Sequence, residues 1–346
     1  MNPVLTKNEI MQISHQIVLY LCLMEKTEQL KKEFAGFMDS VRFDYQPEEL
    51  YAPILYTLYQ KGKRLRPMLC LLACEMFGGK IDDALYPALA LEIFHNSTLI
   101  HDDIMDQAPI RRGMETVYRK WNANSAILSG DAMVALAFDL VMRTPRAIDT
   151  VRLLTKVYRE VCEGQQHDMN FETRPEVSIP EYLEMIRLKT AVLLATSLQM
   201  GAVVAGAGDE DQQKLYDFGI AIGMAFQLQD DVLDCYADEA VFGKKTGGDI
   251  VENKKTYMLL KARELAAQED RAFLDSLFSS TTVEEPSKKI QSVLAVYDRL
   301  HVKKHAEQLI GEYYRQADLF LDSVQLPRDR KTPLRDYVLL LLGRDK

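Results

Sequence analysis

The chain has 346 residues, with 42 lysines and arginines against 51 aspartates and glutamates, and its net charge is −9. This acidic balance argues against nucleic acid as a general partner. The length alone would allow two domains, but no Pro-, Gly- or Ser-rich linker divides the chain, so we predict one large domain. The five cysteines lack Cys-x-x-Cys spacing and mostly lie in apolar runs, which predicts free, buried thiols in a reducing cytoplasm.

The N-terminal segment differs from the rest of the chain. Residues 17–24 form an apolar run, but the run is far shorter than the roughly 20 residues that cross a bilayer. Neither a basic leader nor a small-residue cleavage site marks a signal peptide, so we expect no stable insertion into a membrane. We interpret residues 1–23 as an N-terminal extension and residues 24–346 as the folded domain. A short helix on the surface is the alternative for the extension.

The remaining sequence has the apolar spacing of helices and lacks the alternation of strands, so the predicted fold class is all-α. Glycine and proline punctuate it, for example at Gly78-Gly79, Pro145 and Pro180. Helices are predicted over residues 25–40, 48–60, 65–77, 83–106, 123–142, 147–170, 180–206, 210–237, 253–268, 284–322 and 334–343.

A basic segment opens the third of these helices. Gly62, Lys63 and Arg66 come just before an apolar run, in the sequence GKRLRP. Backbone N–H groups and the dipole at a helix start favour an anion, and Lys63 and Arg66 would add charge-assisted hydrogen bonds to a phosphate. Taken alone, the pattern is a weak signal, because basic residues near a helix start are more often simply solvated.

Three aspartates end the next helix. Asp102, Asp103 and Asp106 follow a long apolar run and precede Arg111 and Arg112. On a helix, Asp102 and Asp106 project from one face, where like charges are unfavourable without a compensating cation. For a single motif of this kind, a solvated helix end is the alternative interpretation.

A second cluster repeats the pattern later in the chain. Asp230, Asp231 and Asp234 follow Phe226 and Gln227 in apolar, helix-forming sequence. Ligand sets made only of oxygen suit hard divalent cations, and Mg²⁺ commonly shares such sites with phosphates. The pair of clusters favours metal binding over two solvated helix ends. We expect the clusters to face each other across a helical bundle, with Mg²⁺ ions and one diphosphate between them.

Several other basic residues gain meaning from the aspartates, because a metal-bound diphosphate also needs positive charge on the side away from the metals. Lys189, beside Thr190, and Lys244 and Lys254 are candidates, although each is a weak signal alone. The glycine-containing segment from Phe242 to Asp249 is typical of a mobile loop.

Taken together, these motifs resemble the trans-isoprenyl diphosphate synthases, which make farnesyl, geranylgeranyl and longer prenyl diphosphates. The resemblance is strong from about residue 50 to residue 260 and excludes residues 1–23. It implies a single bundle around a deep central cavity, a homodimer, and Mg²⁺ as cofactor with Mn²⁺ as a substitute. The matching segments are Gly62-Lys63-x-x-Arg66-Pro67, His95, Asp102-Asp103-x-x-Asp106 with Arg111-Arg112-Gly113, Lys189-Thr190, Phe226-Gln227-x-x-Asp230-Asp231-x-x-Asp234, Gly243-Lys244, Gly248-Asp249 and Asn253-Lys254.

The resemblance implies a head-to-tail condensation between an allylic diphosphate and isopentenyl diphosphate. The metals would bind the aspartates of both clusters and, with neighbouring cations, stabilise the leaving diphosphate. The residues implied to bind isopentenyl diphosphate are Gly62, Lys63, Arg66, His95 and Arg112. Those implied at the metals are Asp102, Asp103, Asp106, Asp230, Asp231 and Asp234. Those implied to assist ionisation or stabilise the allylic cation are Arg111, Lys189, Thr190, Gln227, Lys244 and Lys254.

Two of these assignments have alternatives. His95 can be an ordinary core histidine on an apolar helix, and Asp234 can reach a metal only through water.

Product length depends on side chains that lie deeper than the first aspartate cluster. Thr98 and Ser97 precede Asp102 by about one helical turn, or 5.4 Å, and both are small. In short-chain members of the family, an aromatic residue or an insertion closes the cavity at this level. Phe94, a further turn away, is the next candidate floor. This arrangement favours a product of twenty carbons, and thirty to forty carbons if Phe94 points aside.

Three other functions fit less well. Terpene cyclases share a first aspartate motif but carry a different second one, and squalene-type synthases have a looser pattern. A non-catalytic regulatory subunit usually loses aspartates or the basic residues around them. Both clusters and the basic positions are intact in this sequence, which favours an active enzyme.

Overall fold

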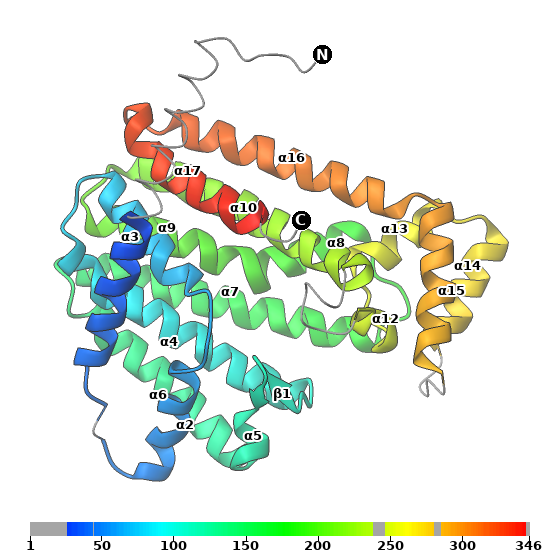
Figure 1. Ribbon diagram of the computed structural model, residues 1–346, viewed down its shortest axis with the longest axis horizontal. Coiled ribbons are helices and arrows are strands. Elements are labelled where there is room, and N and C mark those ends of the chain that lie inside the picture. Colours follow the sequence, from blue (N-terminus) through cyan, green and yellow to red (C-terminus); the bar gives the residue numbers. More distant parts are fainter. Residues whose placement is uncertain (1–25, 44, 238–245, 280–284, 344–346) are drawn as a thin grey trace, which may run out of the picture. The chain divides into compact units, whose positions relative to one another are not determined.

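The computed structural model describes residues 26–43, 45–237, 246–279 and 285–343. Helices dominate these residues (Figure 1), which confirms the all-α prediction. The chain packs into two compact units. Unit 1 comprises Met1–Arg152, Ser197–Gly208 and Leu326–Leu341, and unit 2 comprises Leu153–Thr196, Asp209–Gln325 and Leu342–Lys346.

Unit 1 is built around α4 (Ile81–Met105), which packs against α3 and α6. Its middle is buried on all sides, including Leu89, Ile93 and Phe94, because residues 84–91 and 93–94 are apolar. The first aspartate motif therefore lies at the end of a rigid, buried helix. The other elements of unit 1 are a helix over residues 26–40, α2 (Glu48–Leu58), α3 (Leu65–Met76), β1 (Ile110–Arg111), β2 (Met114–Glu115), α5 (Val117–Lys120), α6 (Ala123–Val141), the second part of α9 (Val192–Val204) and most of α17 (Arg328–Gly343).

Unit 2 is built around α10 (Asp209–Tyr236), the helix that carries the second aspartate motif and packs against α16. Met224, Leu228, Tyr257 and Tyr297 belong to its apolar core. Its other elements are most of α7 (Ala147–Thr173), α8 (Ile179–Ile186), a π-helix η1 (Arg187–Ala191), the first part of α9 (Val192–Val204), α12 (Gly248–Val251), α13 (Tyr257–Leu265), α14 (Gln268–Ser279), α15 (Pro286–Arg299) and α16 (Val302–Ser323).

Two helix predictions are wrong. The single helix expected over residues 284–322 is two helices, because His301 adopts a left-handed conformation, with a φ of 54°, between α15 and α16. No glycine or proline marks this break. Residues 269–279, for which no helix was expected, form most of a further helix, α14 (Gln268–Ser279).

The cysteine prediction holds for part of the chain. Cys70, Cys74 and Cys235 are free and buried, whereas Cys162 is free but exposed. The prediction of a buried thiol is wrong for Cys162, because this residue lies on the solvent-facing side of α7. Cys22, the proposed extension over residues 1–23, and residues 242–245 of the expected loop lie outside the described residues.

One described helix, α6, is long and apolar enough to cross a membrane by length and composition. A single helix of this kind is a weak indication, because core helices pass the same test. Here α6 packs against α2 and α4, and Met133 and Ala137 are fully buried in that packing. Its apolar character is therefore explained by the core of unit 1.

Candidate active site

Basic side chains gather in unit 1 where the loop before α3 meets α4 and the β1–β2 hairpin. Gly62 in this loop lies against Arg112, and a Cβ on Gly62 would come within 3.3 Å of the guanidinium carbon. Lys63 is exposed, and Arg66 is in the first turn of α3 with a buried Nε that has no hydrogen-bond partner among the described residues. The glycine thus leaves room for an arginine at the point where the sequence predicts a phosphate.

The electrostatics of this cluster favour an anion. The pKa of Arg66 is lowered to about 10, mainly by burial, with Glu92 opposing the shift and Arg112 adding to it. Burial, followed by the positive charges of Arg66 and Arg112, holds the pKa of His95 well below its usual value. His95 is therefore neutral near pH 7, and its imidazole can donate a hydrogen bond without adding charge. A diphosphate would relieve the repulsion among the arginines.

The three aspartates of the first motif have different surroundings. Asp103 is buried and accepts a hydrogen bond from the Nε of Arg111 at 2.6 Å. Asp102 is partly buried and Asp106 is exposed, one turn further along at the end of α4. The C-terminus of a helix carries partial negative charge, which repels carboxylates. A cation bound to Asp102 and Asp106 would therefore be stabilising.

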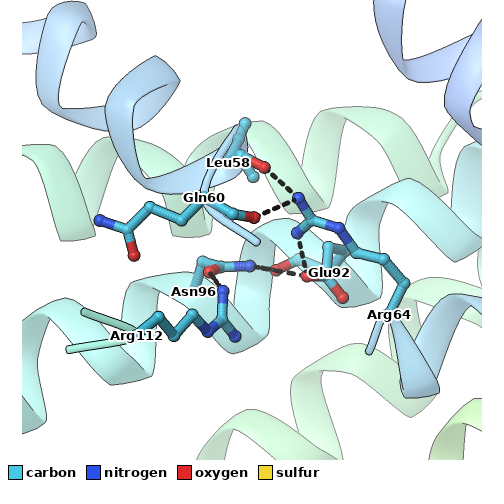
Figure 2. A network of polar contacts seen from close by, with 6 residues as sticks. All are labelled: Leu58, Gln60, Arg64, Glu92, Asn96 and Arg112. Atoms are coloured by element: carbon cyan, nitrogen blue, oxygen red, sulfur yellow. Dashed lines mark hydrogen bonds and ion pairs between the residues drawn. The ribbon is translucent and has the colours of Figure 1, made fainter. Parts of the chain in front are cut away.

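A two-residue hairpin presents the arginines that follow this motif. β1 and β2 are antiparallel, with Arg111 paired to Met114. The two turn residues, Arg112 and Gly113, have φ values of 53° and 77°, as a tight hairpin with a type I′ turn requires. The strands are too short to give a periodic signal in the sequence. The hairpin separates the two side chains: Arg111 pairs with Asp103, whereas Nη1 of Arg112 lies 3.4 Å from Oδ1 of Asn96 (Figure 2).

The second motif, in unit 2, repeats this division. Asp231 is buried and accepts hydrogen bonds from the Tyr182 hydroxyl at 2.5 Å, Nε2 of Gln227 at 3.3 Å and the backbone N–H of Tyr257 at 3.3 Å. Asp230 is exposed and Asp234 is partly buried. Burial, followed by the charge of Asp249, raises the pKa of Asp231 well above its ordinary value.

Within the described residues, no group of three or more His, Cys, Asp and Glu side chains is arranged to hold a metal ion. The second aspartate of each motif, Asp103 and Asp231, is buried and accepts hydrogen bonds from other side chains. The first and last aspartates of each motif, Asp102 with Asp106 and Asp230 with Asp234, are spaced by one turn and are the more accessible carboxylates. Their oxygen donors suit Mg²⁺.

The predicted Lys189 and Thr190 lie in the π-helix η1 (Arg187–Ala191), and single π-turns of this kind are frequent at functional sites. The Lys189 ammonium lies 2.5 Å from Oδ2 of Asp168, and Thr190 donates to Oε1 of Gln227 at 3.0 Å. Sequence reasoning missed Asp168 and Tyr182. Neither belongs to a motif, so only their contacts with Lys189 and Asp231 identify them.

Gly164 on α7 makes the position of η1 possible. A Cβ at residue 164 would lie 2.4 Å from the backbone N of Lys189 and 2.8 Å from the carbonyl carbon of Leu188. These are backbone atoms, so they cannot move out of the way as a side chain would.

We therefore expect Gly164→Ala to displace the π-helix, to cost about 1–3 kcal/mol of stability, and to lower turnover by roughly ten- to a hundredfold through the misplacement of Lys189. Thermal melts and steady-state kinetics measure the two effects. Gly311→Ala on α16 is the matched control, because nothing lies within 4 Å of its added Cβ. Normal turnover of the Gly164 variant would contradict this account of η1.

The segment after α10 returns to the second motif. The backbone N–H of Asp249 donates to Oδ2 of Asp234 at 3.1 Å, and Nζ of Lys254 lies 3.6 Å from Oδ1 of Asp249. Burial raises the pKa of Asp249 to about 7, with Asp234 adding to the shift and Lys254 opposing it. The crowding of carboxylates predicted from the sequence is therefore real in unit 2. Lys244 lies outside the described residues.

The pKa of Asp249 predicts a pH-dependent stability of the metal-free protein. Because the folded form binds this proton more tightly than the unfolded chain, stability falls as pH rises from about 4 to about 7 and then stays low. The loss is on the order of a few kcal/mol. In chelator, we expect a lower melting temperature at pH 8 than at pH 5, and a smaller difference in Asp249→Asn. Asp318→Asn, at an exposed position on α16, is the control, and an unchanged difference in Asp249→Asn would refute the assignment.

An all-α fold with a cluster of arginines and two aspartate motifs is what an enzyme that acts on diphosphate esters with divalent metals requires. Comparison with known protein families identifies the family. The family model described as polyprenyl synthetase matches residues 47–296, which span parts of both units. The chain belongs to this family, as the resemblance predicted, and is a prenyltransferase.

Individual relatives agree with this assignment. The geranylgeranyl diphosphate synthase of Methanosarcina mazei is 37% identical over 311 residues, which cover 88% of this chain and 94% of the relative. The geranylfarnesyl diphosphate synthase of Natronomonas pharaonis is 40% identical over 239 residues, covering 63% and 70%. A crystal structure of a geranylgeranyl pyrophosphate synthase matches with a TM-score of 0.87 and 41% identity, covering 92% of this chain and 99% of that one.

Proposed function

We propose that this prenyltransferase condenses isopentenyl diphosphate with an allylic diphosphate and releases geranylgeranyl diphosphate. The observation that carries the proposal is the cation cluster of unit 1. There Gly62 makes room for Arg112, and Arg66 has a buried Nε for which the described part of the chain provides no hydrogen-bond partner. It lies near an aspartate motif on the same helix as His95. Relatives named geranylgeranyl diphosphate synthases support the product.

Isopentenyl diphosphate is assigned to the cation cluster. Lys63, Arg66 and Arg112 supply charge for its phosphates, and neutral His95 supplies a donor. Gly62 keeps the loop close to Arg112. The double bond of this substrate then attacks the allylic carbon, and the proton lost afterwards goes to the released diphosphate.

The allylic diphosphate is assigned to the aspartate motifs. Asp102, Asp106, Asp230 and Asp234 are proposed as ligands of Mg²⁺, or of Mn²⁺ in its place, because they are the accessible carboxylates of each motif. When bound, the metal neutralises the leaving diphosphate. Asp103 and Asp231, first predicted as ligands, are proposed to position Arg111 and Gln227, with which they form hydrogen bonds.

Residues of unit 2 are proposed to assist the ionisation. Lys189, Lys244 and Lys254 add positive charge for the leaving diphosphate. Thr190 and Gln227 hydrogen-bond each other and are proposed to stabilise the allylic cation. Exclusion of water from this step protects the cation.

Product length is proposed to depend on α4. Phe94 and Ser97 are fully buried, and Thr98 is partly buried with its hydroxyl bonded to the carbonyl of His95. An isoprene unit is about as long as one helical turn, roughly 5.4 Å. Ser97 and Thr98 are small enough to leave one more turn for the chain than an aromatic residue would.

We therefore expect Ser97→Phe to shorten the product and Phe94→Ala to lengthen it by one or more isoprene units. Both variants should keep the rate of the first condensation, because the aspartates lie at least a turn away along α4. Chromatography of dephosphorylated products measures this. An unchanged distribution in Phe94→Ala would place the floor elsewhere and leave the alternative product of thirty to forty carbons open.

The cellular location, the oligomeric state and the partners of the enzyme are proposed from the same family resemblance. We propose a cytoplasmic homodimer without stable membrane insertion, acting on small diphosphate substrates and not on nucleic acid. The acidic net charge of −9 and the buried thiols support the location and the absence of nucleic acid. The intact aspartates and basic residues oppose a regulatory subunit without activity.

A further inference from the structure

Glu92 is a buried carboxylate inside the cation cluster, and none of the roles above uses it. Its side chain on α4 is 2% exposed, and its Oε1 lies 2.5 Å from Nη1 of Arg64. The same oxygen accepts a hydrogen bond from Nδ2 of Asn96 at 3.0 Å (Figure 2). A buried charge is costly unless it is paired and hydrogen-bonded, and here the pairing organises two arginines.

Arg64 is the first of these arginines. Its Nη2 donates to the backbone carbonyl of Gln60 at 3.0 Å and to that of Leu58, the last residue of α2 (Figure 2). Together with Glu92, these carbonyls occupy both ends of its guanidinium fork. Arg64 itself has a φ of 48°, a conformation that costs free energy and persists only where surrounding contacts enforce it. Arg64 thus ties the loop that carries Gly62 and Lys63 to both α2 and α4.

Arg112 is the second arginine, and Asn96 connects it to Glu92. Two bonds from Nδ2 of Asn96, to the backbone carbonyl and to Oε1 of Glu92, fix the amide so that its Oδ1 faces Nη1 of Arg112 (Figure 2). This last contact is long, at 3.4 Å. It aims the guanidinium while leaving most of its donors for a ligand.

We propose that Glu92 is a positioning residue that gives the two arginines different roles. It pairs with Arg64, which fixes the loop that carries Gly62 and Lys63. Through Asn96 it also directs Arg112 toward the diphosphate of isopentenyl diphosphate. This inference rests on the proposed function of the cluster. In the protein without substrate, Arg64, Arg66 and Arg112 repel one another, and Glu92 is a buried counter-charge among them. It opposes the lowering of the pKa of both Arg66 and Arg112 by burial.

The proposal predicts an outcome opposite to the one that simple electrostatics predicts. Removing a negative charge beside an anion site should tighten anion binding if charge alone matters. If Glu92 positions the arginines, its neutral isostere should weaken binding, because the loop and Arg112 lose their fixed geometry.

The test measures binding of isopentenyl diphosphate alone by calorimetry, without allylic substrate. We expect Glu92→Gln to raise the Kd at least tenfold and Asn96→Leu, which breaks only the relay to Arg112, to raise it about threefold. Thr57→Val, which removes a buried hydroxyl on α2 that donates to the carbonyl of Pro53, should stay within twofold. In kinetics, the KM for isopentenyl diphosphate should rise while kcat and the KM for the allylic substrate change less than threefold.

A double variant tests whether Glu92 acts through Arg64. Because both residues serve one anchor, Glu92→Gln combined with Arg64→Met should bind no more weakly than the weaker single variant. Additive losses, unchanged or tighter binding by Glu92→Gln, or equal losses in kcat and in both KM values would overturn the proposal. If Glu92→Gln does not fold, Asn96→Leu decides, with unchanged binding as the contrary result. Failure of the wild-type protein to bind isopentenyl diphosphate would instead refute the proposed function.

Discussion

Replacement of Asp102 or Asp230 by alanine is expected to lower turnover by at least about a thousandfold. Each residue is the accessible first carboxylate of its motif, and each is proposed to bind the metal that neutralises the leaving diphosphate. Removing one preorganised electrostatic contact of this kind commonly costs a factor of about 10²–10³, and loss of a metal ion costs more. Single-turnover kinetics at saturating Mg²⁺ and substrates measure the effect.

The same helices provide matched controls for these variants. Asp82→Ala lies in the first turn of α4 and Asp217→Ala in an earlier turn of α10, and both should keep nearly normal turnover. All four variants should remain folded by circular dichroism, because Asp102 and Asp230 are not core residues. Near-normal turnover of either Asp102→Ala or Asp230→Ala would refute the metal assignment.

Alanine at Lys63 or Arg66 is expected to raise the KM for isopentenyl diphosphate by roughly ten- to a hundredfold, whereas alanine at Lys189 or Lys244 should mainly lower kcat. The first pair is assigned to the diphosphate that stays bound through the reaction, so its loss removes ground-state binding. The second pair is assigned to the diphosphate that leaves, where charge develops only in the transition state.

Kinetics with each substrate varied in turn separate these effects. Lys61→Ala, at an exposed lysine in the same loop as Lys63, and Lys261→Ala on α13 are the controls. The division of roles fails if the alanine variants at Lys63, Arg66, Lys189 and Lys244 all show the same kinetic defect.

The sequence predicted the helical architecture because most helices carry their own signals. Ser178 and Glu181, for example, form a capping box at the start of α8, and apolar runs mark α4 and α10. His301 gives no such signal, because neither a glycine nor a proline marks the left-handed residue between α15 and α16. The π-helix at Lys189 is equally hidden, since it depends on the close approach of Gly164 from a distant part of the chain.

The sequence predicted those site residues that belong to motifs of charged residues. It did not predict residues that act by pairing with another side chain of the site. The aspartates and the basic residues from Gly62 to Arg66 are adjacent in sequence and identify themselves. Asp168 and Glu92 do not, because each is a single acid whose meaning comes from the cation it pairs with, Lys189 in one case and Arg64 in the other. From the sequence, only Asp234 was set apart, as a residue that can reach a metal only through water. In the structure, burial distinguishes Asp103 and Asp231 from their neighbours.

The central claim is that this protein joins isopentenyl diphosphate to an allylic diphosphate in a metal-dependent, head-to-tail reaction. The direct test incubates the full chain with labelled isopentenyl diphosphate, an allylic primer and Mg²⁺, then identifies the dephosphorylated product by chromatography and mass spectrometry. We predict consumption of isopentenyl diphosphate, its arrest by chelator, and a linear product of twenty carbons. Failure to consume isopentenyl diphosphate with any allylic primer, or release of a cyclic hydrocarbon from the allylic substrate alone, would contradict the claim.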